Sequence, residues 1–268
     1  MPVDDAGPES LLAPAAMLGV LASGAALSGP VLPGLRTAAR EYGYALSVLA
    51  APGRAGDAAL AALRQRGVSG IVVLEPHLAA VLAPAAGVPL VAAGPTDQYD
   101  GARRATEHLL GLGHPTVWHV GGPEERPIAR ERERGWRETL ERHGAGVPPV
   151  VRGDWSARSG YRAGQTLAVE PGVCAVFAAN DHMALGLLAA FAEAGMRVPR
   201  DAHVVGFDDV AEAAYFAPPL TTIRQDHVAA GRHTLAVLAA RIGGDAIPEP
   251  RTAGAELVVR ESSRSSVR

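Results

Sequence analysis

Short apolar runs alternate with amphipathic stretches along almost the whole chain. Apolar runs this short favour buried strands, and apolar positions spaced by three or four favour helices packed against them. The pattern predicts strands at residues 17–22, 45–49, 70–74, 88–92, 117–120, 150–151, 174–178, 202–206 and 257–259. It predicts helices at residues 35–42, 57–66, 78–86, 100–112, 128–143, 156–169, 183–194 and 227–242.

Repeated alternation of strand and helix predicts parallel sheets covered by helices on both faces, which is an α/β architecture. A chain of 268 residues suits two α/β subdomains better than one small core. The glycine-rich turns contain neither a GxGxxG nor a GxxxxGK[ST] pattern. The two common nucleotide-binding loops are therefore not indicated.

Two of the predicted strands end in polar side chains. Asn180 and Asp181 follow the run VFAA, and Asp208 and Asp209 follow the run VVGF. Ligands of open α/β sheets bind at the carboxyl ends of the strands, and amide and carboxylate groups suit a molecule rich in hydroxyls. We expect Asn180 to face the ligand and Asp181 to cap the next helix. The adjacent Asp208 and Asp209 should point in different directions, which argues against a catalytic pair.

Charge and composition narrow the function further. The formal net charge is −3, and all 25 basic residues are Arg with no basic excess. A surface that binds nucleic acid usually has such an excess. The single Cys174 cannot form an internal disulfide, which fits a reducing compartment. The nine His have no metal-ligand spacing, and no Ser or Cys lies on a nucleophile motif. We therefore expect no metal, no cofactor and no catalysis.

The N-terminal part of the sequence admits two interpretations. Residues 1–14 have no periodicity and are expected to be disordered. Residues 11–26 resemble a signal peptide, but acidic residues and no basic residue precede their apolar part, which is the wrong charge for export. We interpret residues 17–22 as the first buried strand. No stretch has the length and apolar character of a transmembrane helix.

Eight motifs, in order and with matching spacing, resemble the effector-binding core of the lactose-repressor (LacI/GalR) family. The resemblance extends from about residue 17 to residue 262. The motifs are ATEHLLGLGH (105–114), GGP (121–123), ARERERGW (129–136), GDWSARSGY (153–161), FAANDHMALG (177–186), VVGFDD (204–209), PPLTTIRQD (218–226) and ELVVRES (256–262).

The resemblance implies the periplasmic-binding-protein type I fold, in which two Rossmann-like α/β lobes with parallel sheets are joined by three crossovers. The N-terminal lobe is expected at residues 15–96 plus 227–251. The C-terminal lobe is expected at residues 97–226 plus 252–268. Lobes of this kind close by a hinge motion around a ligand that lies between them.

The family's ligand contacts can be transferred residue by residue. Arg132 matches an arginine that binds ligand hydroxyls or a carboxylate, as a planar guanidinium with five donors can. Trp155 matches a ring that stacks on the ligand, while Asn180 and Asp208 match groups that bind its hydroxyls. The remaining implied contacts are Ser23 after the first strand, Asp97 at the first crossover and Gln225 at the second.

Two departures from the family pattern leave the ligand class open. Ala93 stands where the family commonly has an acidic residue that binds ligand. The segment between Ala92 and Asp100 is also several residues shorter than usual. A deoxy sugar, a smaller polyol and a non-sugar metabolite all remain open as ligands.

The expected function is that of an effector-sensing core of a transcriptional repressor, which binds a small, sugar-like metabolite reversibly and controls DNA binding allosterically. Operator DNA would be bound only through a helix-turn-helix head that this chain does not contain. We expect cytoplasmic localisation, no membrane contact and a homodimer. The expected dimer contacts are Met183, Leu185, Leu188 and Phe216.

Two alternatives stay open at this point. One is a periplasmic solute-binding protein that serves a sugar transporter. The other is an α/β enzyme such as a sugar hydrolase or phosphatase, which would need a nucleophile or a metal that the sequence does not indicate.

Overall fold

The computed structural model describes residues 16–23, 27, 31–50, 56–75, 79, 81–93, 96–249 and 254–264. The chain divides into two compact units and passes from one to the other three times. Of the described residues, unit 1 holds those up to 93 together with 227–249, and unit 2 holds 96–226 together with 254–264. Thr96, which we predicted as the end of the first lobe, belongs to unit 2. The predicted disordered lead lies outside the described residues.

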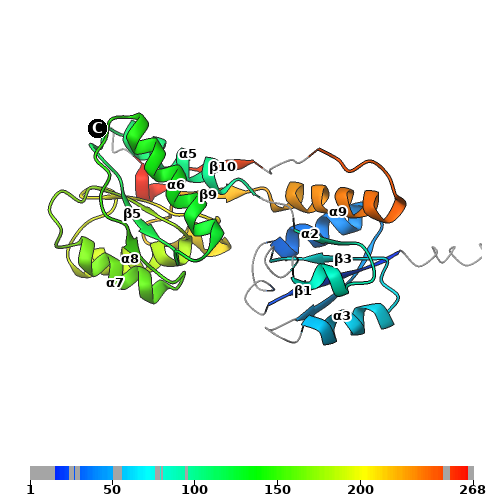
Figure 1. Ribbon diagram of the computed structural model, residues 1–268. Helices are drawn as coiled ribbons and strands as arrows, with labels where there is room; N and C mark the ends of the chain where they lie inside the picture. Colours follow the sequence, from blue (N-terminus) through cyan, green and yellow to red (C-terminus); the bar gives the residue numbers. More distant parts are fainter. Residues whose placement is uncertain are drawn as a thin grey trace, which may run out of the picture. The chain divides into compact units, whose positions relative to one another are not determined.

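Unit 1 is a four-stranded parallel sheet with helices on both faces (Figure 1). Alternate residues of its central strand serve the two faces, since Leu18 and Val20 pack in one apolar cluster and Leu21 packs in another. The strand order is β2 (Ala45–Ala50), β1 (Met17–Ala22), β3 (Gly70–Val73) and β4 (Leu90–Ala92). One face is covered by α2 (Val31–Glu41) and α9 (His227–Gly243), and the other by α3 (Gly56–Gln65).

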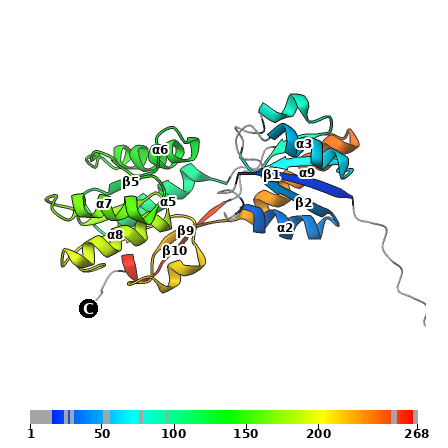
Figure 2. The same ribbon diagram turned by 90° about the horizontal axis from the view of Figure 1, so that it is seen from below.

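Unit 2 has a second four-stranded parallel sheet with two helices on each face (Figure 2). Neighbouring residues of one strand again face opposite ways, because Val176 and Phe177 belong to different apolar clusters. The strand order is β6 (Val151–Arg152), β5 (Trp118–Gly121), β7 (Ala175–Ala178) and β8 (His203–Val205). The helices are α5 (Gln98–Gly111) and α6 (Pro127–Arg142) on one face, and α7 (Ala157–Leu167) and α8 (Asp181–Glu193) on the other.

Helices α7 and α8 touch backbone to backbone because glycine occupies the contact. A Cβ at Gly186 would lie 1.9 Å from the Ala157 carbonyl oxygen, and one at Gly160 would lie 2.0 Å from the Met183 carbonyl oxygen. No side chain fits at either position, so the spacing of the two helices is set by these glycines.

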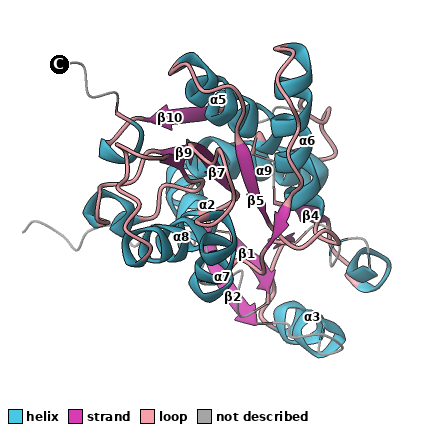
Figure 3. Ribbon diagram, turned by 90° about the vertical axis from the view of Figure 1, so that its left-hand side faces the viewer, coloured by secondary structure: helices cyan, strands magenta, loops and turns pink. Residues whose placement is uncertain are grey.

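A two-stranded antiparallel sheet lies beside the parallel sheet of unit 2 (Figure 3). It consists of β9 (Thr222–Gln225) and β10 (Ala255–Val258), with Gln225 opposite Ala255. Our sequence analysis predicts no strand at 222–225, because the residues TIRQ contain no apolar run. Both strands adjoin points where the chain leaves or enters unit 2.

Other predicted boundaries shift by a few residues. The helix predicted at 35–42 begins at Val31, and the strand predicted at 257–259 lies at Ala255–Val258. Within 78–86, residues 81–82 are helical, and the 3-10 turn η2 (Ala83–Ala85) follows them. Across the described ranges, no helix combines the length and apolar character needed to cross a membrane.

Candidate functional site

The carboxyl ends of the four parallel strands of unit 2 lie at one edge of the sheet. The segments after β6, β7 and β8 bring Trp155, Asn180 and Asp208 to this edge, and α6 contributes Arg132. We call these four residues the strand-end cluster. Our sequence analysis placed all four at a ligand, and the structure brings them together in unit 2.

Arg132 is the centre of the cluster. Its side chain is buried, and its Nη2 donates to Asp208 Oδ1 at 2.9 Å. Nη1 donates to the carbonyl oxygen of Ala179, and Nε donates to Gln98 Oε1 at 2.7 Å. Burial lowers the pKa of the guanidinium, while the Asp208 carboxylate raises it. A guanidinium stays protonated in proteins, so Arg132 and Asp208 form a buried ion pair.

Aromatic rings flank the guanidinium. The Arg132 Cζ lies 3.7 Å from the centroid of the Phe207 ring and 5.6 Å from that of the Trp155 ring. The Trp155 indole lies against Gly122, where a Cβ would come within 2.2 Å of the ring. A cation beside aromatic faces is attracted by their π electrons, so both rings help to hold the guanidinium in place.

Asn180 takes the capping role that we predicted for Asp181. The Asn180 side-chain oxygen accepts from the Met183 backbone N–H at 2.9 Å and thereby caps α8, while its Nδ2 donates to the Trp155 carbonyl oxygen at 3.0 Å. The expectation that Asp181 caps the helix was wrong, because its carboxylate points to other partners. Asn180 thus holds the Trp155 backbone in place as well as the start of α8.

Asp181 is a buried carboxyl group beneath the strand-end cluster. The pKa of Asp181 is raised to about 7, mainly by burial and also by the nearby Asp208. Hydrogen bonds from Thr222 Oγ1 at 2.5 Å and from the Val210 N–H at 2.9 Å act in the opposite direction and lower the pKa. Gly206 must lack a side chain because a Cβ there would lie 2.3 Å from Asp181 Oδ1. Asp181 therefore joins α8 to the loop after β8 and to β9.

Asp208 and Asp209 point in different directions, as we predicted. Asp208 faces Arg132, whereas Asp209 accepts from Arg224 Nε at 2.6 Å and from Arg260 Nη2 at 2.7 Å. Both aspartates have positive φ, 106° for Asp208 and 51° for Asp209, which is strained for a residue with a side chain. Asp209 thus links Arg224 of β9 to Arg260, which follows β10.

The remaining predicted contacts have hydrogen-bond partners outside the strand-end cluster. Asp97 caps α5, since its carboxylate accepts from the Asp100 N–H at 2.8 Å. The Gln225 Nε2 donates to Thr96 Oγ1. Ser23 belongs to unit 1, where it follows β1 and its backbone N–H donates to Glu75 Oε2 at 2.9 Å.

Four residues near these sites were missed by our sequence analysis. Glu75 follows β3, so the strand-end argument that singled out Asn180 would also have found it. Phe207 was assigned only to an apolar run, and Asp209 was considered only as a neighbour of Asp208. Gln98 lies in the first turn of α5, where nothing in the sequence pattern indicates contact with Arg132.

The four predicted dimer contacts do not form one exposed stripe. Met183 is fully buried in the core of unit 2, so it cannot contact a partner, and this prediction was wrong. Its neighbour Leu185 points the opposite way and is 40% exposed, since residues two apart on a helix face different sides. Leu188 is nearly buried, and the half-buried Phe216 packs against the same core.

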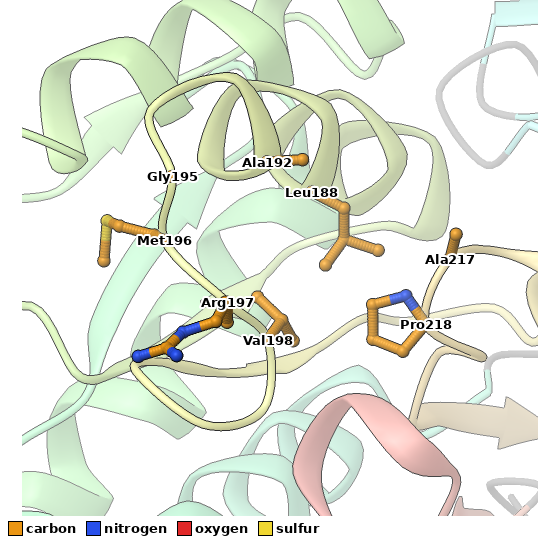
Figure 4. A pocket seen from close by; sticks show the side chains of 8 residues that line it. All are labelled: Leu188, Ala192, Gly195, Met196, Arg197, Val198, Ala217 and Pro218. Carbon is orange, nitrogen blue, oxygen red and sulfur yellow. The ribbon is translucent and has the colours of Figure 1, made fainter.

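Leu188 also borders a hollow of about 310 Å³ on the surface of unit 2 (Figure 4). The hollow lies between α8, the turn that follows it and the loop that precedes β9. Its lining is mostly apolar and consists of Leu188, Ala192, Gly195, Met196, Arg197, Val198, Ala217 and Pro218. The strand-end cluster contributes none of these residues.

Metal binding has no support in the part of the chain that the structure describes. No group of three His, Cys, Asp or Glu side chains there could hold a metal ion. The chemistry available to the strand-end cluster is hydrogen bonding and stacking.

Comparison with known proteins places this geometry in a family. Residues 106–263 match the family described as periplasmic binding protein-like domain. The lactose operon repressor of Escherichia coli (strain K12) is 33% identical over 281 residues, which cover 96% of this chain and 76% of that protein. The alignments with this and other curated relatives span between 44% and 76% of their lengths.

Solved structures agree with the sequence comparison. The lac repressor dimer bound to operator and the anti-inducer ONPF superposes with a TM-score of 0.81 at 31% identity, covering 94% of this chain and 95% of that chain. A complex of the transcriptional regulator CelR with cellobiose superposes with a TM-score of 0.80 at 30% identity, covering 92% of this chain and 84% of that chain.

Proposed function

Because this chain belongs to the lactose-repressor family of transcriptional regulators, we propose that it binds a small, uncharged, hydroxyl-rich effector at the strand-end cluster and thereby regulates DNA binding. The matched relatives are repressors, so the chain is a repressor-type effector core and not the binding protein of a sugar transporter. The position of the effector between two lobes stays a prediction.

The observation that carries this proposal is the Arg132–Asp208 ion pair at the strand-end edge. Arg132 uses three N–H groups toward the described residues, and a guanidinium has five, so two are not used by this part of the chain. Asp208 is partly exposed, and only one of its carboxylate oxygens accepts a hydrogen bond from the described residues. Adjacent donors and acceptors of this kind match neighbouring hydroxyl groups.

The charge balance favours a neutral effector. Asp208 already neutralises Arg132. A phosphorylated or carboxylated ligand would bring a further negative charge close to Asp208, which is repulsive at short range. The Trp155 indole offers a surface for the apolar face of a sugar ring.

The test is a binding screen followed by calorimetry. Galactose, lactose, cellobiose and glucose 6-phosphate are compared by thermal shift, and Kd is measured for each sugar that binds. We expect a neutral sugar to bind and the phosphorylated sugar not to bind. Arg132 and Asp208 would each donate to or accept from an effector hydroxyl, so Arg132→Ala and Asp208→Ala should each raise Kd by about tenfold or more, the factor expected for losing one hydrogen bond to a charged group.

Arg137→Ala and Asp201→Ala are the matched controls. Both residues form ion pairs on the surface of unit 2, away from the strand-end cluster, and should leave Kd unchanged. Circular dichroism checks that each variant is folded. An unchanged Kd in folded Arg132→Ala and Asp208→Ala would rule out this placement of the effector.

The proposal extends to a homodimer that uses the surface around the hollow. Leu185 and Tyr215 are 40% and 87% exposed, and both lie on elements that border the hollow or adjoin it. Exposed apolar side chains beside an apolar depression are typical of an interface between proteins. A structural relative is described as the lac repressor dimer, which supports a second copy of this chain as the partner.

Operator DNA would be bound by a helix-turn-helix head in the assembled regulator, and such a regulator acts in the cytoplasm, where the operator is. The effector acts by binding one conformational state of the regulator more tightly than the other. This shifts the equilibrium between the states, and no covalent bond in the effector is made or broken.

A further inference from the structure

A chain of hydrogen bonds leads away from Arg132 toward the points where the polypeptide enters and leaves unit 2. Arg132 Nε donates to Gln98 Oε1 at 2.7 Å, and Gln98 Nε2 donates to Thr96 Oγ1 at 2.6 Å. The same Thr96 oxygen accepts from Gln225 Nε2. Four side chains from three segments that are distant in the sequence are therefore joined in one series.

The chemistry of the groups fixes the orientation of the Gln98 amide. A guanidinium N–H can only donate, so the Gln98 atom that faces Arg132 must be the carbonyl oxygen. The amide nitrogen then faces Thr96, whose hydroxyl oxygen has two lone pairs and can accept from both glutamines. Gln98 thus uses both ends of its amide, with the oxygen toward Arg132 of α6 and the nitrogen toward Thr96.

The far end of this series is the place where three chain crossings meet. Thr96 is the first described residue of unit 2, and Gln225 is followed by the return of the chain to unit 1 after residue 226. Gln225 pairs with Ala255 across the β9–β10 sheet, and the Asp226 N–H donates to the Gly254 carbonyl oxygen at 3.3 Å, where the chain re-enters unit 2. We call Thr96, Gln225 and Ala255 the crossover junction.

We propose that Gln98 is a positioning residue that holds the Arg132 guanidinium and ties it to the crossover junction. Gln98 itself need not touch the effector. Its role is to make the position of Arg132 depend on the segments through which the chain leaves unit 2. The value of this link for regulation rests on the proposed function, since it requires Arg132 to bind an effector.

The link can be measured without any ligand. The hydrogen-exchange rate of the Arg132 Nε–H is followed by ¹⁵N-edited NMR of the whole chain, and its signal is assigned by its loss in Arg132→Lys. Gln98→Leu removes both amide bonds and should accelerate this exchange about tenfold, the factor expected for losing one hydrogen bond to a charged group. Gln98→Glu should restore slow exchange, because a carboxylate accepts from both Arg132 Nε and the Thr96 hydroxyl.

Thr96 provides the decisive comparison, since no hydrogen bond joins it to Arg132 directly. Thr96→Val removes the hydroxyl and should also accelerate the Arg132 Nε–H exchange, whereas Thr96→Ser should restore it. Gln165→Leu on the exposed face of α7 makes the same chemical change elsewhere and should have no effect.

Two results would overturn the proposal: Arg132 exchange in Gln98→Leu that equals the wild-type rate, or equal exchange rates in Thr96→Val and the wild type. Calorimetry with lactose and cellobiose forms a separate arm. If neither these nor any other neutral sugar binds the wild type, the proposed function fails, while the exchange rates still decide the role of Gln98. If one binds, Gln98→Leu should weaken it and Gln98→Glu should restore it.

Discussion

Three non-glycine residues of the described chain have positive φ: Trp155 (73°), Asp208 (106°) and Asp209 (51°). Two of them belong to the strand-end cluster, and the third is the neighbour of Asp208. Such a conformation costs of the order of 1–3 kcal/mol per residue and persists only where neighbours hold it. The neighbours are identifiable: Asn180 binds the Trp155 carbonyl, Arg132 binds Asp208, and two arginines bind Asp209.

The buried His119 makes the stability of unit 2 depend on pH. Its ring is stacked near Trp136 and Phe177, and Nδ1 lies 2.9 Å from the Phe177 carbonyl oxygen. Burial lowers its pKa from 6.5 to about 4. The folded state therefore binds a proton less readily than the unfolded state, so this contribution to stability is complete above pH 6.5 and is lost as the pH falls toward 4.

From these values the wild type should lose about 2 kcal/mol of unfolding free energy between pH 7.5 and pH 5 through His119 alone. His119→Phe keeps a stacked ring and removes the titration, so its loss over the same range should be smaller by that amount. Urea unfolding at the two pH values measures the difference. An equal loss in wild type and His119→Phe would contradict the prediction, and His182→Gln at an exposed site is the control.

For single residues, the sequence was informative in two ways. Asn180 and Asp208 could be singled out because they follow predicted strands, and Arg132 and Trp155 could be singled out by family resemblance. The partners of Asn180 and Asp181 could not, because adjacent residues at the start of a helix can both act as caps, and tertiary contacts decide between them. The role of Gln98 could not be predicted either, because its contact with Arg132 joins two different helices, α5 and α6.

Among the elements, the contact between α7 and α8 depends on glycine more than on apolar side chains. Gly186→Ala would place a Cβ 1.9 Å from a backbone oxygen, which cannot rotate away. The helices must separate, so we expect a loss of roughly 1–3 kcal/mol in unfolding free energy. Chemical denaturation at constant pH gives the value.

Gly111→Ala is the matched control for this element. It is the same substitution at the end of another helix, with no atom within 4 Å of the new Cβ. Alanine is the better helix former by up to about 1 kcal/mol, so this variant should be as stable as the wild type or more stable. If Gly186→Ala were equally stable, the close contact would not control the packing of α7 and α8.

The inner parallel strands β1, β3 and β7 could be predicted because each is a short apolar run buried on both faces, as Val176 and Phe177 illustrate. The strand Thr222–Gln225 could not, because three of its four residues are polar and its pairing partner lies about thirty residues further along the chain. Local pattern thus determines the sheet interiors, whereas the small antiparallel sheet depends on contacts between distant segments.

For the whole molecule, self-association is the property to test. We expect Leu185→Glu and Tyr215→Glu to convert a dimer into a monomer, because each places a charge in the apolar surface beside the hollow. Sedimentation velocity measures the change. Val169→Glu changes an exposed apolar residue that follows the C-terminal end of α7 and should leave the dimer intact. A wild-type chain that sediments as a monomer, or variants that stay dimeric, would refute this interface.

The division of each unit between separate chain segments has a consequence for synthesis on the ribosome. Unit 1 needs α9, whose Leu235 and Leu238 complete one face of its sheet, and α9 is made after most of unit 2. Unit 2 needs β10 and the residues up to 264, which are made after α9. Neither unit can therefore complete its native core during translation until residues beyond 226 have emerged from the ribosome. Until then, part of the apolar surface of each unit stays exposed.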